Sequence, residues 1–159
     1  MTIRELNGLP SDQAYAEFLK VCGSEKWAAQ MVSLRPYQDT DMLRERATEV
    51  WRRMNPSDWM QAFATHPKIG EAANSEWSKQ EQSKASQANA RTAASLKLAN
   101  ETYQKKFGYI FIICATGKTA DEILSSLNLR LLNSPQGELT IACEEQLKII
   151  HLRLEKLIR

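Results

Sequence analysis

Apolar residues recur three and four positions apart along most of the chain, which is the spacing of one face of an α-helix. Several of these stripes begin at a residue that favours a helix start, such as Ser24, Asp39 or Pro56. Glycine or proline follows several of them, as is common after a helix end. The pattern therefore predicts an all-α protein. The expected helices cover about 11–22, 24–34, 39–54, 56–66, 78–107, 119–131 and 139–157.

The longest of the predicted central helices runs from Ser78 to about Phe107. It follows a loop expected at 70–77, and its first four residues, Ser78-Lys79-Gln80-Glu81, fit a capping box. Its inward positions are mostly alanine, and such a stripe of small residues allows close approach to a neighbouring helix.

The segment 107–115 departs from the helical pattern. It has no helical period and is rich in β-branched and aromatic residues, but no second strand candidate occurs to pair with it. We therefore expect an extended apolar segment that crosses a helical core. Its backbone amides need partners other than a sheet ladder, and a ligand can supply some of them. The predicted fold is a single-domain, all-α multi-helix bundle over 1–159 with this segment threaded through it.

Composition and charge exclude several classes of protein. The formal net charge is only +2 and the basic residues are dispersed, which argues against a nucleic-acid partner. The longest apolar run, 109–115, is too short to span a membrane. The three cysteines, Cys22, Cys114 and Cys143, are widely spaced among apolar residues, and no CxxC or HxxxH pattern accompanies them. We expect buried thiols, no metal site and a reducing, cytoplasmic location.

Two polar residues, His66 and Glu81, are candidates for chemistry, and each also has a structural interpretation. His66 lies at a sharp turn before Pro67, where an imidazolium can also cap the preceding helix. Glu81 is explained as the carboxylate of the capping box. Together with Ser78 and Gln82, it also suits a small anion or a urea-like group at a helix start. From these local patterns alone, the structural interpretation is favoured for both.

An ordered set of motifs changes this balance, because the chain resembles the OHCU (2-oxo-4-hydroxy-4-carboxy-5-ureidoimidazoline) decarboxylase family. The resemblance runs from about Leu6 to the C-terminus, and it is the order of the motifs that is specific, since none is specific by itself. The motifs are Leu6-Asn7-Gly8-Leu9-Pro10, Cys22-Gly23-Ser24-x-x-Trp27, Arg35-Pro36-Tyr37, His66-Pro67-Lys68-Ile69-Gly70, Ser78-x-x-Glu81-Gln82, Asn100-x-x-Tyr103-x-x-x-Phe107-Gly108-Tyr109, Phe111-Ile112-Ile113-Cys114-Ala115 and Glu122-Ile123-Leu124.

This resemblance implies an all-α homodimer that needs neither a metal nor an organic cofactor. It implies a carboxy-lyase that converts OHCU to (S)-allantoin in urate and purine degradation, with protonation on one face of the substrate. His66 matches the family's catalytic histidine and Glu81 its essential glutamate. The implied substrate contacts are Pro67, Ser78, Gln82, Phe111, Ile112, Ile113, Cys114 and Ala115.

The chain departs from many members of the family at one position. They carry an arginine after the apolar segment, where this chain has Thr116, which cannot supply a guanidinium. Lys118 or Arg35 are candidates to replace that charge, or the site works without it. Two other functions stay open: a decarboxylase or hydrolase of another ureido-imidazole compound, and a non-catalytic helical interaction module in which His66 and Glu81 are only caps.

Overall fold

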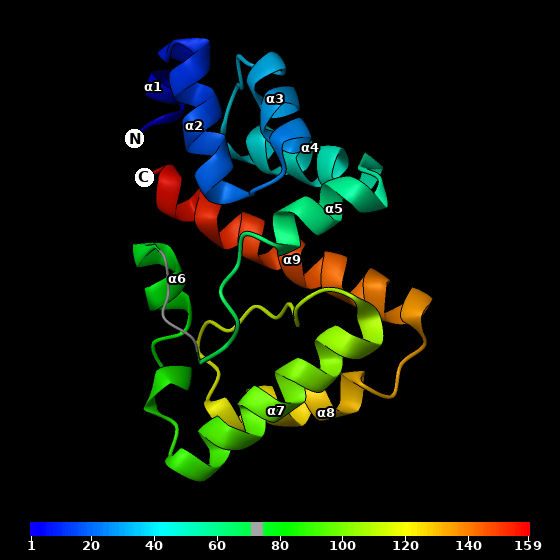
Figure 1. Ribbon diagram of the computed structural model, residues 1–159. Coiled ribbons are helices and arrows are strands. Elements are labelled where there is room, and N and C mark those ends of the chain that lie inside the picture. The colour runs from blue at the N-terminus through cyan, green and yellow to red at the C-terminus, as the bar shows by residue number, and fades with distance from the viewer. Residues whose placement is uncertain (71–74) are drawn as a thin grey trace. The chain divides into compact units, whose positions relative to one another are not determined.

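The computed structural model describes residues 1–70 and 75–159, and all regular structure in that part of the chain is helical. The predicted all-α class is confirmed. None of the helices there is long and apolar enough to cross a membrane. The elements labelled in Figure 1 are α1 (Ile3–Gly8), α2 (Ser11–Val21), α3 (Glu25–Ser33), α4 (Thr40–Arg53), α5 (Pro56–Phe63), α6 (Glu76–Glu81), α7 (Ala90–Phe107), α8 (Ala120–Arg130) and α9 (Pro135–Leu157), with a 3-10 turn at Ala85–Gln87.

By its internal contacts the chain divides into two compact units. The first unit contains residues 1–65 and 147–159, and the second contains residues 66–146. Helix α9 contributes its first part to the second unit and its last part to the first. The single domain expected from the sequence therefore stays a prediction. All the residues of the predicted site belong to the second unit.

The helices of the first unit follow the apolar stripes and N-caps that the sequence predicts. The Ser24 side chain accepts a hydrogen bond from the Trp27 amide, and Asp39 caps α4 in the same way. The Phe18 and Trp27 rings pack edge to face with centroids 5.9 Å apart, and the buried Trp27 indole donates to the Ala47 carbonyl. These contacts close an aromatic core between α2, α3 and α4.

The predicted end of the helix before His66 is displaced. Helix α5 ends at Phe63 with Ala64 as its C-cap, so His66 lies beyond the helix rather than at its end. Helix α2 begins at Ser11, as expected, with Pro10 at its N-cap position. Proline fits this start because a helix N-terminus needs no hydrogen bond from its nitrogen.

The prediction of one helix from 78 to about 107 is wrong. Ser75, not Ser78, is the N-cap of the short helix α6, and its side chain accepts a hydrogen bond from the Ser78 amide. Asn89 supplies a second cap through Thr92 and starts α7, so the chain is helical on both sides of an irregular stretch. The expected loop at 70–77 is wrong at 76–77, which are helical, and its residues 71–74 lie outside the described part.

The predicted non-helical segment is confirmed at 110–115, but Phe107 is still helical and residues 108 and 109 form a bend. Helix α7 continues to Phe107 and ends at Gly108, whose φ of 85° is the left-handed conformation that glycine adopts readily. Phe111, Ile112 and Ile113 are then buried without forming a strand. Helices α7 and α8 pack side by side in this unit (Figure 1).

A buried ionic cluster anchors this segment. The Arg130 guanidinium donates to the Ile112 carbonyl oxygen over 2.7 Å and lies over the Phe111 ring. Arg130 Nε also donates to Glu138 Oε1 over 2.7 Å, and the Tyr103 hydroxyl donates to the same oxygen over 2.6 Å. Burial and the Glu138 carboxylate raise the pKa of Tyr103. The cluster therefore supplies a side-chain partner to a backbone that has no sheet neighbour.

Candidate active site

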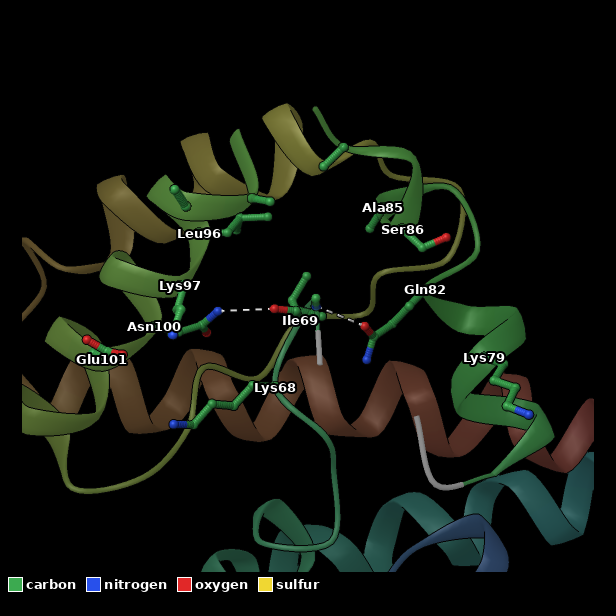
Figure 2. Close-up of a pocket in the computed structure, with 14 residues that line it drawn as sticks. Lys68, Ile69, Lys79, Gln82, Ala85, Ser86, Leu96, Lys97, Asn100 and Glu101 are labelled. Carbon is green, nitrogen blue, oxygen red and sulfur yellow. Dashed lines mark hydrogen bonds between the residues drawn. The ribbon is translucent and has the colours of Figure 1, made fainter. Parts of the chain in front are cut away.

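The loop from His66 to Gly70 lies at the start of the second unit and is held by two side-chain amides. Gly70 has a φ of 91°, and its amide donates to Gln82 Oε1 over 3.3 Å. The buried Asn100 of α7 donates to the Ile69 carbonyl over 3.4 Å. Figure 2 shows the two bonds reaching the loop beside Ile69 from opposite sides. The loop is therefore fixed against the end of α6 and the middle of α7.

The His66 imidazole is half-buried, and its Nε2 lies 2.7 Å from Oε1 of Gln146 in α9. Gln146 itself is fully buried, with 0% of its surface exposed. Because the cap of α5 is Ala64 and this ring nitrogen pairs with α9, the structure favours a positioned imidazole over a helix cap for His66.

The residue before Gln146 reaches the extended segment. Oε1 of the buried Glu145 accepts a hydrogen bond from the Cys114 amide over 3.2 Å. Two consecutive residues of α9 thus hold the His66 ring and the backbone of the 111–115 segment. Helix α9 therefore connects His66 with the 111–115 segment, although the sequence analysis had given α9 no part in the site.

Glu81 does not act as a capping-box carboxylate. It is the last residue of α6, whose start is capped by Ser75, and it is buried with 9% of its surface exposed. A buried carboxylate costs free energy unless its partners or its function compensate. The structural interpretation of Glu81 as a capping-box carboxylate is therefore wrong.

The other expected contacts from α6 divide between two places. Ser78 is buried, and its Oγ accepts a hydrogen bond from the Ser75 hydroxyl over 2.9 Å. Gln82 lines a cavity of about 750 Å³ between α6, the 68–70 loop and α7 (Figure 2). Among the described residues that line this cavity, Gln82 alone belongs to the predicted site. Polar groups on its wall include Lys68, Lys79, Lys97, Asn100 and Glu101.

The candidates for the missing arginine differ in their surroundings. Arg35 belongs to the first unit, where its Nη1 donates to the carbonyls of Leu6 and Leu9. Lys118 belongs to the second unit, together with the predicted site, and its side chain is half-exposed. Lys118 is therefore the better candidate, since the Arg35 guanidinium already has backbone partners.

The cysteines behave largely as expected, and all three are thiols rather than halves of a disulfide. Burial raises the pKa of both Cys22 and Cys143 to about 12, which keeps these thiols protonated and unreactive at neutral pH. Cys114 is half-buried and enters the site through its backbone amide. No cluster of potential metal ligands occurs among the residues at 1–70 and 75–159.

Sequence reasoning missed Glu145 and Gln146 as parts of this site. Both lie on a continuous amphipathic helix, and a glutamate followed by a glutamine there is typical of a solvated face. A signal was nevertheless present for Asn100, which occurs in one of the motifs but was assigned no role. Asn100 is buried and its bond to the Ile69 carbonyl holds the 66–70 loop in place.

The chain is similar in sequence to several known proteins. The sequence model of a family described as OHCU decarboxylase matches residues 7–155. The uric acid degradation bifunctional protein TTL of Arabidopsis thaliana is 41% identical over 89% of this chain, which spans only 46% of that protein's length. A 2-oxo-4-hydroxy-4-carboxy-5-ureidoimidazoline decarboxylase of Amia calva is 30% identical over all of this chain and 95% of its own.

A solved structure shows the same fold. It is described as OHCU decarboxylase in the presence of (S)-allantoin, and it superposes with a TM-score of 0.81 at 40% identity. The match covers 89% of this chain and 96% of that one.

Proposed function

Because the chain belongs to the OHCU decarboxylase family, we propose that it removes CO2 from OHCU and releases (S)-allantoin, as a step of urate degradation. The observation that supports this most directly is the His66 imidazole, held at 2.7 Å by Gln146 within the unit that contains every predicted site residue. A positioned imidazole is the group most often used for proton transfer at neutral pH.

The substrate contains its own electron sink. When the bond between the ring carbon and the carboxylate breaks, its electron pair forms a double bond to the neighbouring carbon. The pair of the adjacent C=N bond moves onto nitrogen, which takes a proton. The hydroxyl then loses its proton to become a carbonyl, and the neighbouring carbon gains one to become the stereocentre of allantoin. This sequence needs no external electron acceptor, so the proposal includes no organic cofactor.

His66 and Glu81 divide the proton chemistry in this proposal. His66 serves as the general acid and base beside the departing carboxylate and delivers a proton to one face. Glu81 accepts a hydrogen bond from the substrate hydroxyl and takes up its proton as the carbonyl forms. Pro67, Ser78, Gln82 and the 111–115 backbone hold the ureido and ring carbonyl groups, which is consistent with a buried segment that forms no strand.

The test is to add the protein to freshly generated OHCU and follow the circular dichroism of the allantoin produced. We expect protein-dependent formation of one enantiomer, because protonation inside an asymmetric site selects one face of the intermediate. A racemic product that forms at the spontaneous rate would overturn the proposal and favour a non-catalytic helical module. Turnover of another ureido-imidazole compound in place of OHCU would favour the related enzyme.

Replacing Glu81 by glutamine should lower turnover at least about 10-fold, because an amide cannot take up a proton from the hydroxyl. Thermal unfolding should change little, since Ser75 rather than Glu81 caps α6. Ser75→Ala measures the cap by itself and should lose about 1 kcal/mol of stability, which the glutamine variant should not. Full activity of the glutamine variant would exclude Glu81 from the chemistry.

We further propose that the protein is a homodimer. Three leucines of the second unit are exposed although they are large and apolar: Leu98 at 65%, Leu129 at 69% and Leu132 at 81%. Exposed apolar side chains on neighbouring elements are typical of an interface. Sedimentation equilibrium should give the mass of two chains, and Leu132→Asp should shift the mass towards one chain. A monomer at micromolar concentration would contradict this proposal.

The proposed location is the cytoplasm. Three thiols without a disulfide are characteristic of a reducing compartment. Fractionation of cells with detection of the native chain tests this, and recovery in an oxidising compartment would contradict it.

A further inference from the structure

Gln146 has an unusual position for an uncharged polar residue. It lies in the middle of α9, is fully buried, and places Oε1 2.7 Å from His66 Nε2. Its other polar atom, the amide nitrogen Nε2, is buried and has no hydrogen-bond partner among the residues that the structure describes. Half of the carboxamide therefore binds the imidazole, while the other half is left unsatisfied.

This arrangement is costly for the folded protein. Burying a polar group without a partner lowers stability, and an apolar side chain of similar size avoids that cost. Most buried polar groups in folded proteins have a partner, so an exception calls for a reason. Within residues 1–70 and 75–159 this carboxamide bonds to the His66 ring, so the stability lost at its other atom points to a function at that ring.

The geometry points to Gln146 as the residue that positions the His66 imidazole and fixes its tautomer. This inference rests on the proposed catalytic role of His66. A carbonyl oxygen can only accept a hydrogen bond, so Oε1 selects the ring form with hydrogen on Nε2. It also restricts rotation of the ring, which follows a turn and has no helix of its own to hold it.

The position of Gln146 on a long helix makes it a precise support. Its neighbour Glu145 accepts a hydrogen bond from the Cys114 amide and is itself buried, so this part of α9 is tied to the 111–115 segment. A group held by a packed helix places its partner more accurately than one held by a loop. Gln146 acts through His66, so we describe it as a positioning residue.

The spectroscopic test uses the small number of histidines. The chain has only His66 and His151, so ¹⁵N-labelled histidine gives two ring spin systems, and His151→Gln assigns them. We expect His66 to carry its hydrogen on Nε2 in the parent protein. Gln146→Glu should keep Nε2 protonated, because a carboxylate can only accept there. Gln146→Met removes the acceptor and should raise the Nδ1–H population several-fold.

The kinetic test separates positioning from support of the fold. Gln146→Met should lower kcat at least about 10-fold while KM changes less than about threefold, because the ring is misplaced but the substrate contacts remain. Its melting temperature should stay equal or rise, since an unsatisfied amide is removed. Gln104→Met makes the same chemical change at an exposed position of α7 and should leave all three measurements unchanged.

Two results would overturn the inference. One is a His66 ring without hydrogen on Nε2 in the parent protein, which would mean that Gln146 donates rather than accepts. The other is a methionine variant with an unchanged tautomer ratio and unchanged kcat. The ring measurements need no substrate. If the protein fails to decarboxylate OHCU, the proposed function is refuted, but the tautomer measurements still decide whether Gln146 positions the His66 ring. Should Gln146→Glu fail to fold, Gln146→Met alone decides it.

Discussion

Replacing His66 by alanine should lower the rate of OHCU decarboxylation at least about 100-fold, because proton transfer by a positioned side chain contributes about 10²–10⁴ in rate. The fold should persist, since the imidazole is only half-buried and lies beyond the end of α5. The measurement is steady-state production of chiral allantoin, followed by circular dichroism, with far-ultraviolet dichroism and thermal unfolding to monitor the structure.

His151→Ala provides the matched control for this variant. His151 is the other histidine of the chain, and its Nε2 lies 2.8 Å from the Thr48 hydroxyl in the first unit. We expect its removal to leave kcat within about twofold, because it belongs to the first unit and every residue of the predicted site belongs to the second. Near-native turnover of His66→Ala would remove the imidazole from the mechanism, whatever the control shows.

Replacing Glu138 by leucine should destabilise the protein by about 3–5 kcal/mol, the usual cost of leaving one member of a buried ion pair without its partner. Glu138 is 0% exposed, and its carboxylate binds Arg130, the Tyr103 hydroxyl and Asn133 Nδ2. Its loss leaves the Arg130 guanidinium buried and uncompensated. Urea unfolding of the variant and the parent measures the difference.

Two further variants test the reason for this loss. The double variant Arg130→Met, Glu138→Leu should recover part of the stability, because a buried pair replaced by apolar residues is often close to neutral. Glu155→Leu breaks an exposed pair with Arg44 and should cost less than about 1 kcal/mol. A Glu138 variant as stable as the Glu155 variant would show that the buried cluster does not anchor the extended segment.

Several elements of the fold were predictable because their signals lie within a few residues. Ser24, Asp39 and Thr119 cap their helices by accepting a hydrogen bond from the amide three positions later. The apolar run at 109–115 lacks a helical period and is extended and buried in the structure. The ordered motifs identified the family, which the match over residues 7–155 confirms.

The sequence did not predict the helix limits correctly where several capping residues lie close together. Ser75 and Ser78 both precede residues that can form a first turn, and Asn89 offers a further cap within the same stretch. The sequence cannot rank these caps, because each is worth only about 1 kcal/mol and packing decides among them. The single helix expected from 78 to 107 is therefore interrupted, and Glu81 moves from a capping position to a buried one.

The sequence by itself determined the helical class, most helix starts, the extended segment and the family, because these depend on neighbours along the chain. The tertiary structure alone decided which distant groups meet. His66 and Gln146 are 80 positions apart, and Arg130 reaches the Ile112 carbonyl from the end of α8. No local pattern encodes such contacts, since they follow from how packed helices are rotated and which buried polar atoms then need a partner.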